Sequence, residues 1–97
     1  MTRLSDQQIS QELASLEGWG HSATHLARTF EFADFVAAFG WMSQVALLAE
    51  KMDHHPDWTN VYRTVEVRLS SHDAGGITSR DIALARAINA LPASDAR

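Results

Sequence analysis

Apolar residues near the start of the chain recur every three or four positions, a spacing that predicts a helix with one buried side. Ser5 and Gln8 stand in the order of a capping box, so we expect the helix to begin just after Ser5. Gly18 readily adopts the left-handed conformation that commonly follows a helix, and it marks the expected end. The predicted buried side consists of Ile9, Leu13 and Leu16.

Two later stretches alternate between apolar and polar residues, which is typical of strands with one buried face. The first covers residues 25–32, and a shorter strand over residues 19–23 is expected to pair with it. The second runs from Val61 to Leu69, and we expect it to bend near Arg63. Together these segments supply about four strands. Their predicted buried faces consist of Leu26, Phe30 and Phe32, and of Val61, Val65, Val67 and Leu69.

A long helix is predicted between the two strand regions. Asp34 is a good N-terminal cap, and Pro56 ends the helix because the residue before a proline is pushed out of the helical conformation. The apolar residues form two adjacent stripes, which are wider than packing on one sheet requires. We therefore expect this helix to contact another helix or another subunit, and we predict a homo-oligomer. The stripes are Phe35, Phe39, Met42, Ala46 and Ala49, and Ala38, Trp41, Val45, Leu48 and Met52.

A last helix is predicted after the loop at residues 73–76. Thr78 and Asp81 form a second capping box ahead of apolar residues with helical spacing. The order is therefore helix, two strands, helix, two strands, helix. It predicts an α+β fold in which the helices cover one face of an antiparallel sheet.

Size, charge and composition limit the classes of protein to be considered. With 97 residues and 45% apolar content, residues 1–97 are expected to form a single domain. The net charge of -4, without a basic stripe, argues against direct nucleic-acid binding. No apolar run has the length of a membrane span, and the first residues lack the apolar core of a signal peptide. We therefore expect a soluble, cytoplasmic protein, and the absence of cysteine excludes thiolate chemistry.

Three of the five histidines lie where a predicted element ends. His54 and His55 follow the long helix, and His72 follows the second strand region. An imidazole gives or takes a proton near neutral pH, so histidines gathered at one opening suit general acid and base catalysis. Each also has an ordinary explanation, because a histidine at a helix end interacts with unpaired carbonyl groups and Asp81 completes a capping box. Spacing alone leaves both explanations open.

Metal and cofactor chemistry find less support. The side chains of His54 and His55 diverge as those of chain neighbours do, and the chain has no His-Glu-x-x-His helix. We therefore expect neither a metal site nor a cofactor, and we expect His25 to be a surface residue. Trp19 and Trp58 are the tryptophans best placed to stack on a flat heterocycle.

A set of residues in the second half of the chain resembles the signature of the pterin-4a-carbinolamine dehydratase family, in order and spacing as well as in residue type. The set comprises Glu50, the run Asp53-His54-His55-Pro56, Trp58, Tyr62, His72 and Asp81. Flanking segments at residues 39–42, 45–46, 60–62 and 80–82 are also similar. The resemblance extends over nearly the whole chain.

The resemblance implies a four-stranded antiparallel sheet with three helices on one face, assembled as dimers or tetramers through the long helix and a sheet edge. It implies that the substrate is 4a-hydroxytetrahydrobiopterin, which is formed when an aromatic amino acid hydroxylase uses its tetrahydropterin. That hydroxylase would be a metabolic partner of this protein. Dehydration would yield quinonoid dihydropterin for recycling. The catalytic residues implied are His54, His55, His72 and Asp81. The expected substrate contacts are Asp53, Pro56, Trp58, Ser70, Ser71, Asp73 and Trp19.

Two other functions stay open. Family members in animals also act as dimerisation cofactors for a homeodomain transcription factor through their helical surface, and a broad apolar helix is compatible with that role. The substrate could also be another pterin, such as one in molybdenum cofactor metabolism. Three histidines at one opening favour catalysis, since a pure scaffold has no physical need for them.

Overall fold

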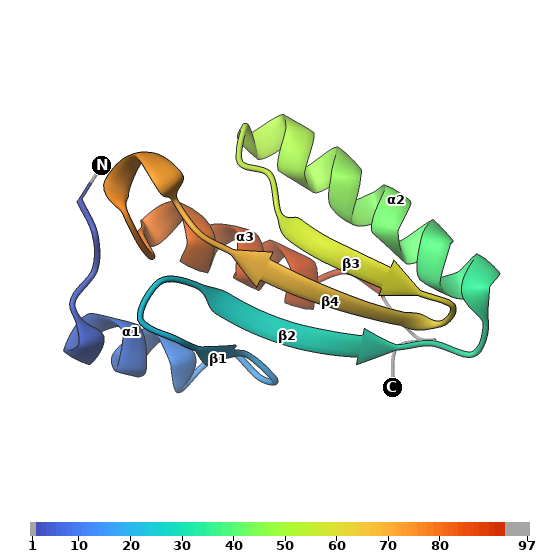
Figure 1. Cartoon of the computed structure of the whole chain (residues 1–97), viewed down its shortest axis with the longest axis horizontal. Coiled ribbons are helices and arrows are strands. Elements are labelled where there is room, and N and C mark those ends of the chain that lie inside the picture. Colours follow the sequence, from blue (N-terminus) through green and yellow to red (C-terminus); the bar gives the residue numbers. More distant parts are fainter. Residues whose placement is uncertain (1, 93–97) are drawn as a thin grey trace.

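The computed structural model describes residues 2–92, and over this range it confirms the predicted fold class and order of elements (Figure 1). The elements are α1 (Asp6–Leu13), β1 (Gly20–His21), β2 (Leu26–Glu31), α2 (Phe35–Met52), β3 (Asp57–Val61), β4 (Thr64–Leu69), the short 3₁₀ helix η1 (His72–Ala74) and α3 (Ser79–Asn89). None of the helices described is long and apolar enough to cross a lipid bilayer.

The four strands form one antiparallel sheet in the order β1-β2-β4-β3, with the helices on one face. Facing pairs such as Phe30 with Val65, and Trp58 with Val67, point toward the helices. The alternate residues of the same strands, among them Thr59 and Glu66, lie on the uncovered face. The core therefore lies between the sheet and the helices, and one face of the sheet stays open.

The helices begin where the sequence predicts. The Ser5 hydroxyl accepts a hydrogen bond from the backbone N–H of Gln8, and the Gln8 side chain accepts one from Ser5. The Asp34 carboxylate accepts a hydrogen bond from the backbone N–H of Ala37 at 2.8 Å. The capping box of Thr78 and Asp81 is also present. Each cap satisfies N–H groups that have no partner inside the helix.

Two predicted boundaries are wrong. The first helix ends at Leu13, and the chain makes tight turns before Gly18, which adopts a φ of 85° just ahead of the sheet. The predicted bend near Arg63 is a two-residue hairpin turn between β3 and β4, in which Tyr62 has a φ of 54°. Strand β3 was hard to predict because it lies at the sheet edge. Val61, expected in the core, is 75% exposed there.

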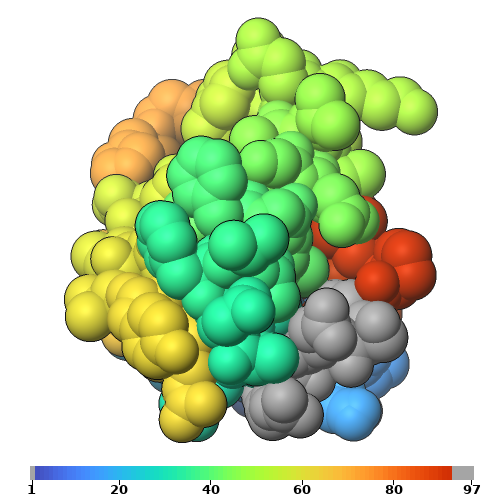
Figure 2. Space-filling view, turned by 90° about the vertical axis from the view of Figure 1, so that its right-hand side faces the viewer, coloured from blue at the N-terminus to red at the C-terminus, as the bar shows by residue number. Residues whose placement is uncertain are grey.

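The two stripes of α2 differ in burial. The stripe that contains Trp41 packs on the sheet, where its ring lies 4.4 Å from Phe30 and 5.2 Å from Phe32 between centroids. The other stripe leaves Phe35 and Phe39 largely exposed. Figure 2 views the end of the molecule where the start of α2 adjoins the β3–β4 turn. We define the apolar patch as the exposed residues Phe35, Val36, Phe39, Leu47, Val61 and Tyr62.

Candidate active site

The end of α2 fixes the position of the first two histidines. Asp53 adopts a left-handed conformation with a φ of 51°, which aspartate tolerates better than most residues. The backbone N–H of His54 then turns back to the carbonyl oxygen of Ala49 at 3.1 Å. Pro56 prevents any further helical turn. The chain leaves α2 abruptly, and the two histidine side chains occupy different environments.

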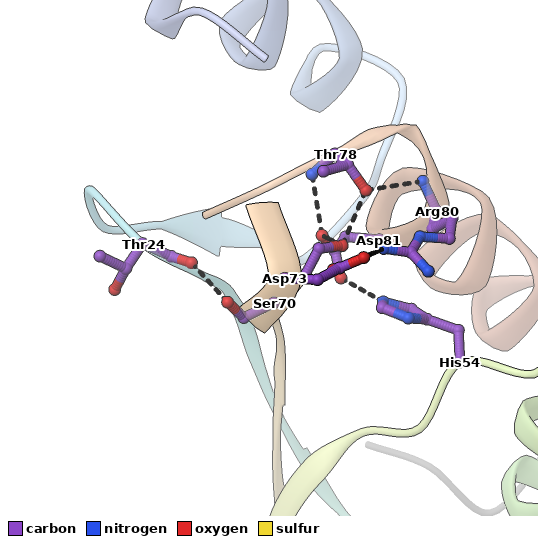
Figure 3. A network of polar contacts seen from close by, with 8 residues as sticks. Thr24, His54, Ser70, Asp73, Thr78, Arg80 and Asp81 are labelled. Atoms are coloured by element: carbon purple, nitrogen blue, oxygen red, sulfur yellow. Dashed lines mark hydrogen bonds and ion pairs between the residues drawn. The ribbon is translucent and has the colours of Figure 1, made fainter. Parts of the chain in front are cut away.

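His54 belongs to a buried polar cluster, which we define as His54, Ser71, Thr78 and Asp81 (Figure 3). Its Nε2 lies 2.5 Å from Oδ1 of Asp81. The other carboxylate oxygen accepts hydrogen bonds from the Ser71 hydroxyl at 2.9 Å and from the backbone N–H of Thr78 at 2.8 Å. Asp81 is therefore both a helix cap and the partner of a histidine.

The hydrogen-bond network assigns the protons in this cluster. A carboxylate that accepts at both oxygens requires a proton on Nε2 of His54. Nδ1, the other ring nitrogen, takes no part in the hydrogen bonds of the cluster. The Ser71 hydroxyl donates to Asp81, so at 2.7 Å it must accept a hydrogen bond from the Thr78 hydroxyl. The Asp81 carboxylate and the hydroxyl groups of Ser71 and Thr78 thus all have partners inside the cluster, as buried polar groups need.

His55 and His72 lie at the surface of the same region. The Nε2 atom of His55 is 2.8 Å from Oε1 of Glu50, and both side chains are well exposed. His72 begins η1 in a short loop closed by two backbone hydrogen bonds between Ser71 and Gly76. Gly75 has a φ of 74° and ends η1 in the left-handed conformation. The loop holds His72 opposite the end of α2.

Asp73 and Arg80 form an ion pair at the edge of the site. One guanidinium nitrogen donates to both carboxylate oxygens of Asp73, at 2.7 and 3.0 Å. Desolvation acts to raise the pKa of the Asp73 carboxyl, but the hydrogen bonds and positive charge of Arg80 outweigh it, and the pKa lies below 3.8.

A cavity of about 270 Å³ brings the three histidines together. We call it the histidine pocket; its lining residues are Asp53, His54, His55, Ser70, Ser71, His72, Asp73 and Arg80. A second cavity of about 360 Å³ adjoins it, and we call this the side cavity. Its lining residues are Thr24, His25, Asp57, Arg68, Ser70, His72 and Gly75. Ser70 and His72 contribute to both walls.

The structure brings most of the predicted site residues to one place. Seven line the histidine pocket, and Asp81 lies directly behind His54. Trp19 does not belong to this region: it is 6% exposed, packs on Phe30, and its indole N–H donates to Asn89. The prediction that Trp19 contacts substrate is therefore not supported.

Within residues 2–92, no group of three or more His, Asp or Glu side chains is arranged to hold a metal ion.

Trp58 and Pro56 also lie outside the lining of the two cavities. Trp58 pairs with Val67 across β3 and β4, so its ring points toward the helices. Strand alternation explains this, because Asp57 rather than Trp58 lies on the uncovered face. The sequence pattern did not point to the lining residues Asp57, Arg68 and Arg80. His25 was predicted to be a surface residue, but it is half-buried and lines the side cavity. The alternation of β4 already placed Arg68 on the open face.

Comparison with known proteins agrees with the resemblance in sequence. Residues 2–91 match the family model described as pterin 4 alpha carbinolamine dehydratase. Proteins named "Putative pterin-4-alpha-carbinolamine dehydratase" from Rhodopseudomonas palustris and Nitrobacter winogradskyi are each 57% identical, over 94% and 92% of this chain and 92% and 90% of their own lengths. A crystal structure described as transcriptional coactivator/pterin dehydratase from Brucella melitensis has a TM-score of 0.88 at 44% identity, covering 92% of this chain and 97% of that one.

Proposed function

The chain belongs to the pterin-4a-carbinolamine dehydratase family and is a dehydratase, and we propose that it converts 4a-hydroxytetrahydrobiopterin into quinonoid dihydropterin and water by histidine acid–base catalysis. The reaction would take place in the cytoplasm and support tetrahydropterin recycling. The observation that carries the proposal is the buried pair of His54 and Asp81, which backs a pocket that two further histidines line.

The proposed reaction needs one proton donor and one proton acceptor. The C4a–O bond breaks as an acid protonates the departing hydroxyl group, which leaves as water. A base removes the proton from N5, and the N–H electrons form the C4a=N5 double bond. No net oxidation or reduction occurs. Histidines suit both tasks at one pH, and such proton transfer contributes roughly 10²- to 10⁴-fold to a rate.

We assign proton transfer at the departing hydroxyl group to His54 and His72. Asp81 holds Nε2 of His54 and directs the other ring nitrogen, Nδ1, to the substrate; it would also stabilise the imidazolium form. His72 lines both cavities and approaches the pocket from the opposite side. His55, paired with Glu50, would orient the pterin ring or act as the partner base.

Stopped-flow absorbance of freshly generated 4a-hydroxytetrahydrobiopterin, with a chelator present, tests the proposal. We expect the native chain to accelerate decay of the substrate, and His54→Ala and His72→Ala each to reduce the acceleration by at least about 100-fold. His21→Ala is the matched control, since His21 is exposed on β1 and is not among the lining residues of either cavity. Native rates in both variants would overturn the histidine assignment. No acceleration by the native chain would favour a binding role for the apolar patch, or another pterin as substrate.

We also propose that the protein is a homo-oligomer. Phe35, Phe39 and Leu47 keep large apolar side chains exposed on α2, and the patch continues to the β3–β4 turn. Exposed apolar side chains gathered on one helix and a neighbouring turn are typical of a subunit interface. Sedimentation velocity should show a dimer or tetramer for the native chain and a shift toward monomer for Phe39→Glu. A native monomer at micromolar concentration would contradict the proposal.

A further inference from the structure

We infer that Arg3 is a positioning residue for His72 and acts through the loop that carries this histidine. The inference rests on the proposed function, in which His72 transfers a proton at the departing hydroxyl group. Arg3 lies before α1 and is not among the lining residues of either cavity. Any effect of Arg3 on turnover must therefore reach the substrate through another residue.

The backbone brings the segment before α1 against this loop (Figure 1). The backbone N–H of Leu4 donates to the carbonyl oxygen of Ile77 at 2.8 Å, and the Leu4 side chain packs against the core. Ile77 is fully buried and directly follows Gly76. Gly76 in turn is bonded to Ser71 in both directions, at 2.8 and 3.3 Å between backbone nitrogen and oxygen. The bond at Leu4 thus fixes the preceding residue, Arg3, beside the closed end of the loop.

The Arg3 side chain lies across the two glycines of the loop. Its Nη1 donates to the carbonyl oxygen of Gly75 at 3.4 Å, and the N–H of Gly75 donates to the carbonyl oxygen of His72 at 3.2 Å. The stem of Arg3 covers Gly76, because a Cβ atom placed on Gly76 would lie 2.5 Å from Cδ and 3.1 Å from Cγ of Arg3. Arg3 therefore binds the residue that is itself bonded to His72.

His72 depends on the loop for its position. Within residues 2–92, its imidazole forms no hydrogen bond or ion pair. The ion pair of Asp73 and Arg80 anchors the start of the loop to α3, and Arg3 anchors its end at Gly75. A displacement of about 1 Å in a group that takes part in a reaction can cost about 100-fold in rate. Arg3 therefore contributes to kcat although it does not touch the substrate.

Two substitutions remove the same contact from opposite sides. Arg3→Ala removes the side chain itself. Gly76→Ala adds a Cβ atom whose three nearest neighbours all belong to the Arg3 side chain, and Gly76 does not have a positive φ. Gly76→Ala should therefore displace the flexible Arg3 side chain rather than the backbone. We expect each variant to lower kcat about 10-fold with KM nearly unchanged, and the double variant to lower kcat no further.

Two further variants separate positioning from general destabilisation. Arg3→Lys keeps a long stem and a donor group, and we expect it to retain most of the native kcat. Arg86→Ala is the matched control, because Arg86 pairs with Glu12 to join α3 to α1 and lines neither cavity. We expect native kcat for Arg86→Ala. Stopped-flow turnover of 4a-hydroxytetrahydrobiopterin over a range of substrate concentrations measures kcat and KM for all variants.

The outcomes distinguish the positioning role from the reaction itself. Native kcat in Arg3→Ala, additive losses in the double variant, or an equal loss in Arg86→Ala would each overturn the positioning role and leave the dehydratase activity intact. No turnover by the native chain would overturn both proposals. Hydrogen exchange at the Gly75 amide, which donates to His72, gives a readout without turnover. We expect exchange to be about 10-fold faster in Arg3→Ala and unchanged in Arg86→Ala. Native exchange in Arg3→Ala would contradict the inference.

Discussion

His54 and His55 are neighbours in the chain, yet their side chains lie in opposite environments. His54 is 8% exposed and is hydrogen-bonded to a carboxylate that is fully buried. The His55 side chain is 59% exposed and pairs with Glu50, whose side chain is 80% exposed. Both contacts join an imidazole to a carboxylate over a short distance. Their surroundings differ, and the surroundings determine how much each contact can contribute.

The difference shows that the fold fixes the buried part of the site more firmly than the exposed part. A buried polar group without a partner costs about 1–3 kcal/mol, so the buried cluster holds its members in one arrangement. An exposed ion pair competes with water and is screened by salt, and it contributes about 0–1 kcal/mol. We therefore expect the buried cluster to set the geometry of catalysis and the exposed residues to adapt to the substrate.

Removal of Asp81 should have the largest effect. Asp81→Ala leaves His54, the Ser71 hydroxyl and the N–H of Thr78 without their shared acceptor. We expect the free energy of unfolding to fall by about 3–5 kcal/mol, as when one partner of a buried pair is lost, and kcat to fall by at least about 100-fold. Chemical denaturation and stopped-flow turnover measure the two quantities.

Asp81→Asn separates the effect of charge from the effect of size, because it keeps the size of the side chain but removes its charge. We expect it to lose less stability than Asp81→Ala and to lose kcat to a similar extent, since an amide cannot stabilise a protonated His54. Native kcat in a folded Asp81→Asn variant would show that the buried cluster is only structural.

Ser71→Ala should have the second-largest effect. The Ser71 hydroxyl donates to Asp81 and accepts from Thr78, so its loss leaves a gap in the buried cluster. We expect a loss of about 1–3 kcal/mol in the free energy of unfolding. We also expect kcat to fall about 10-fold with KM nearly unchanged, because the Ser71 hydroxyl is bonded to Asp81 and Thr78 and acts by positioning Asp81. Denaturation and steady-state kinetics test both.

Ser70→Ala is the matched control for Ser71→Ala, one residue earlier in the chain. Ser70 is only half-buried and bonds to the carbonyl oxygen of Thr24, outside the buried cluster. We expect it to change stability by less than about 1 kcal/mol. Equal losses of kcat in the two variants would place the two serines in the same role, and the contrast between buried and exposed parts would then fail.

The sequence predicted the fold well where local chemistry and periodicity agree. Capping boxes at Ser5 and Thr78 and the stop at Pro56 are local signals, and the helices they predict are present. Strand β3 and the end of α1 were less predictable. Residue Val61 has an apolar side chain that the edge of the sheet leaves in water, and alternation alone cannot distinguish an edge strand from a central one.

The sequence predicted which residues form the candidate site better than it predicted the role of each residue. Ser71 and Asp81 were assigned as a substrate contact and a catalytic residue; the structure buries both and bonds them to each other, with Ser71 in the wall of the histidine pocket and Asp81 behind His54. Burial depends on residues far away in the chain, so spacing cannot reveal it. Trp19 shows the same limit, because an aromatic residue in a turn can face a pocket or the core, and here it faces the core.

Glu50→Gln should have a small effect, because it acts on the exposed pair. The variant keeps a hydrogen-bonding group near His55 and removes the charge. We expect the free energy of unfolding to change by less than about 1 kcal/mol and kcat/KM to change by less than about 3-fold. The same assays in low and high salt should show the difference shrinking as salt screens the pair. A loss as large as that of Ser71→Ala would mean that exposure does not distinguish the two halves of the site.

Asp73→Asn should have the smallest effect, and that effect should depend on pH. Arg80 lowers the pKa of Asp73 in the folded protein below 3.8, so the pair stabilises the fold above the pKa of the unfolded chain. The contribution is lost as the pH falls through the lower, folded pKa. We expect native protein to melt slightly above Asp73→Asn at pH 7, and the two to converge once the pH falls below the folded pKa of Asp73. Asp57→Asn is the control, because Asp57 is exposed and forms no ion pair with any residue between 2 and 92. A difference between native and Asp73→Asn protein that persists at the lowest pH would show that Asp73 shapes the η1 loop through hydrogen bonding rather than through its charge.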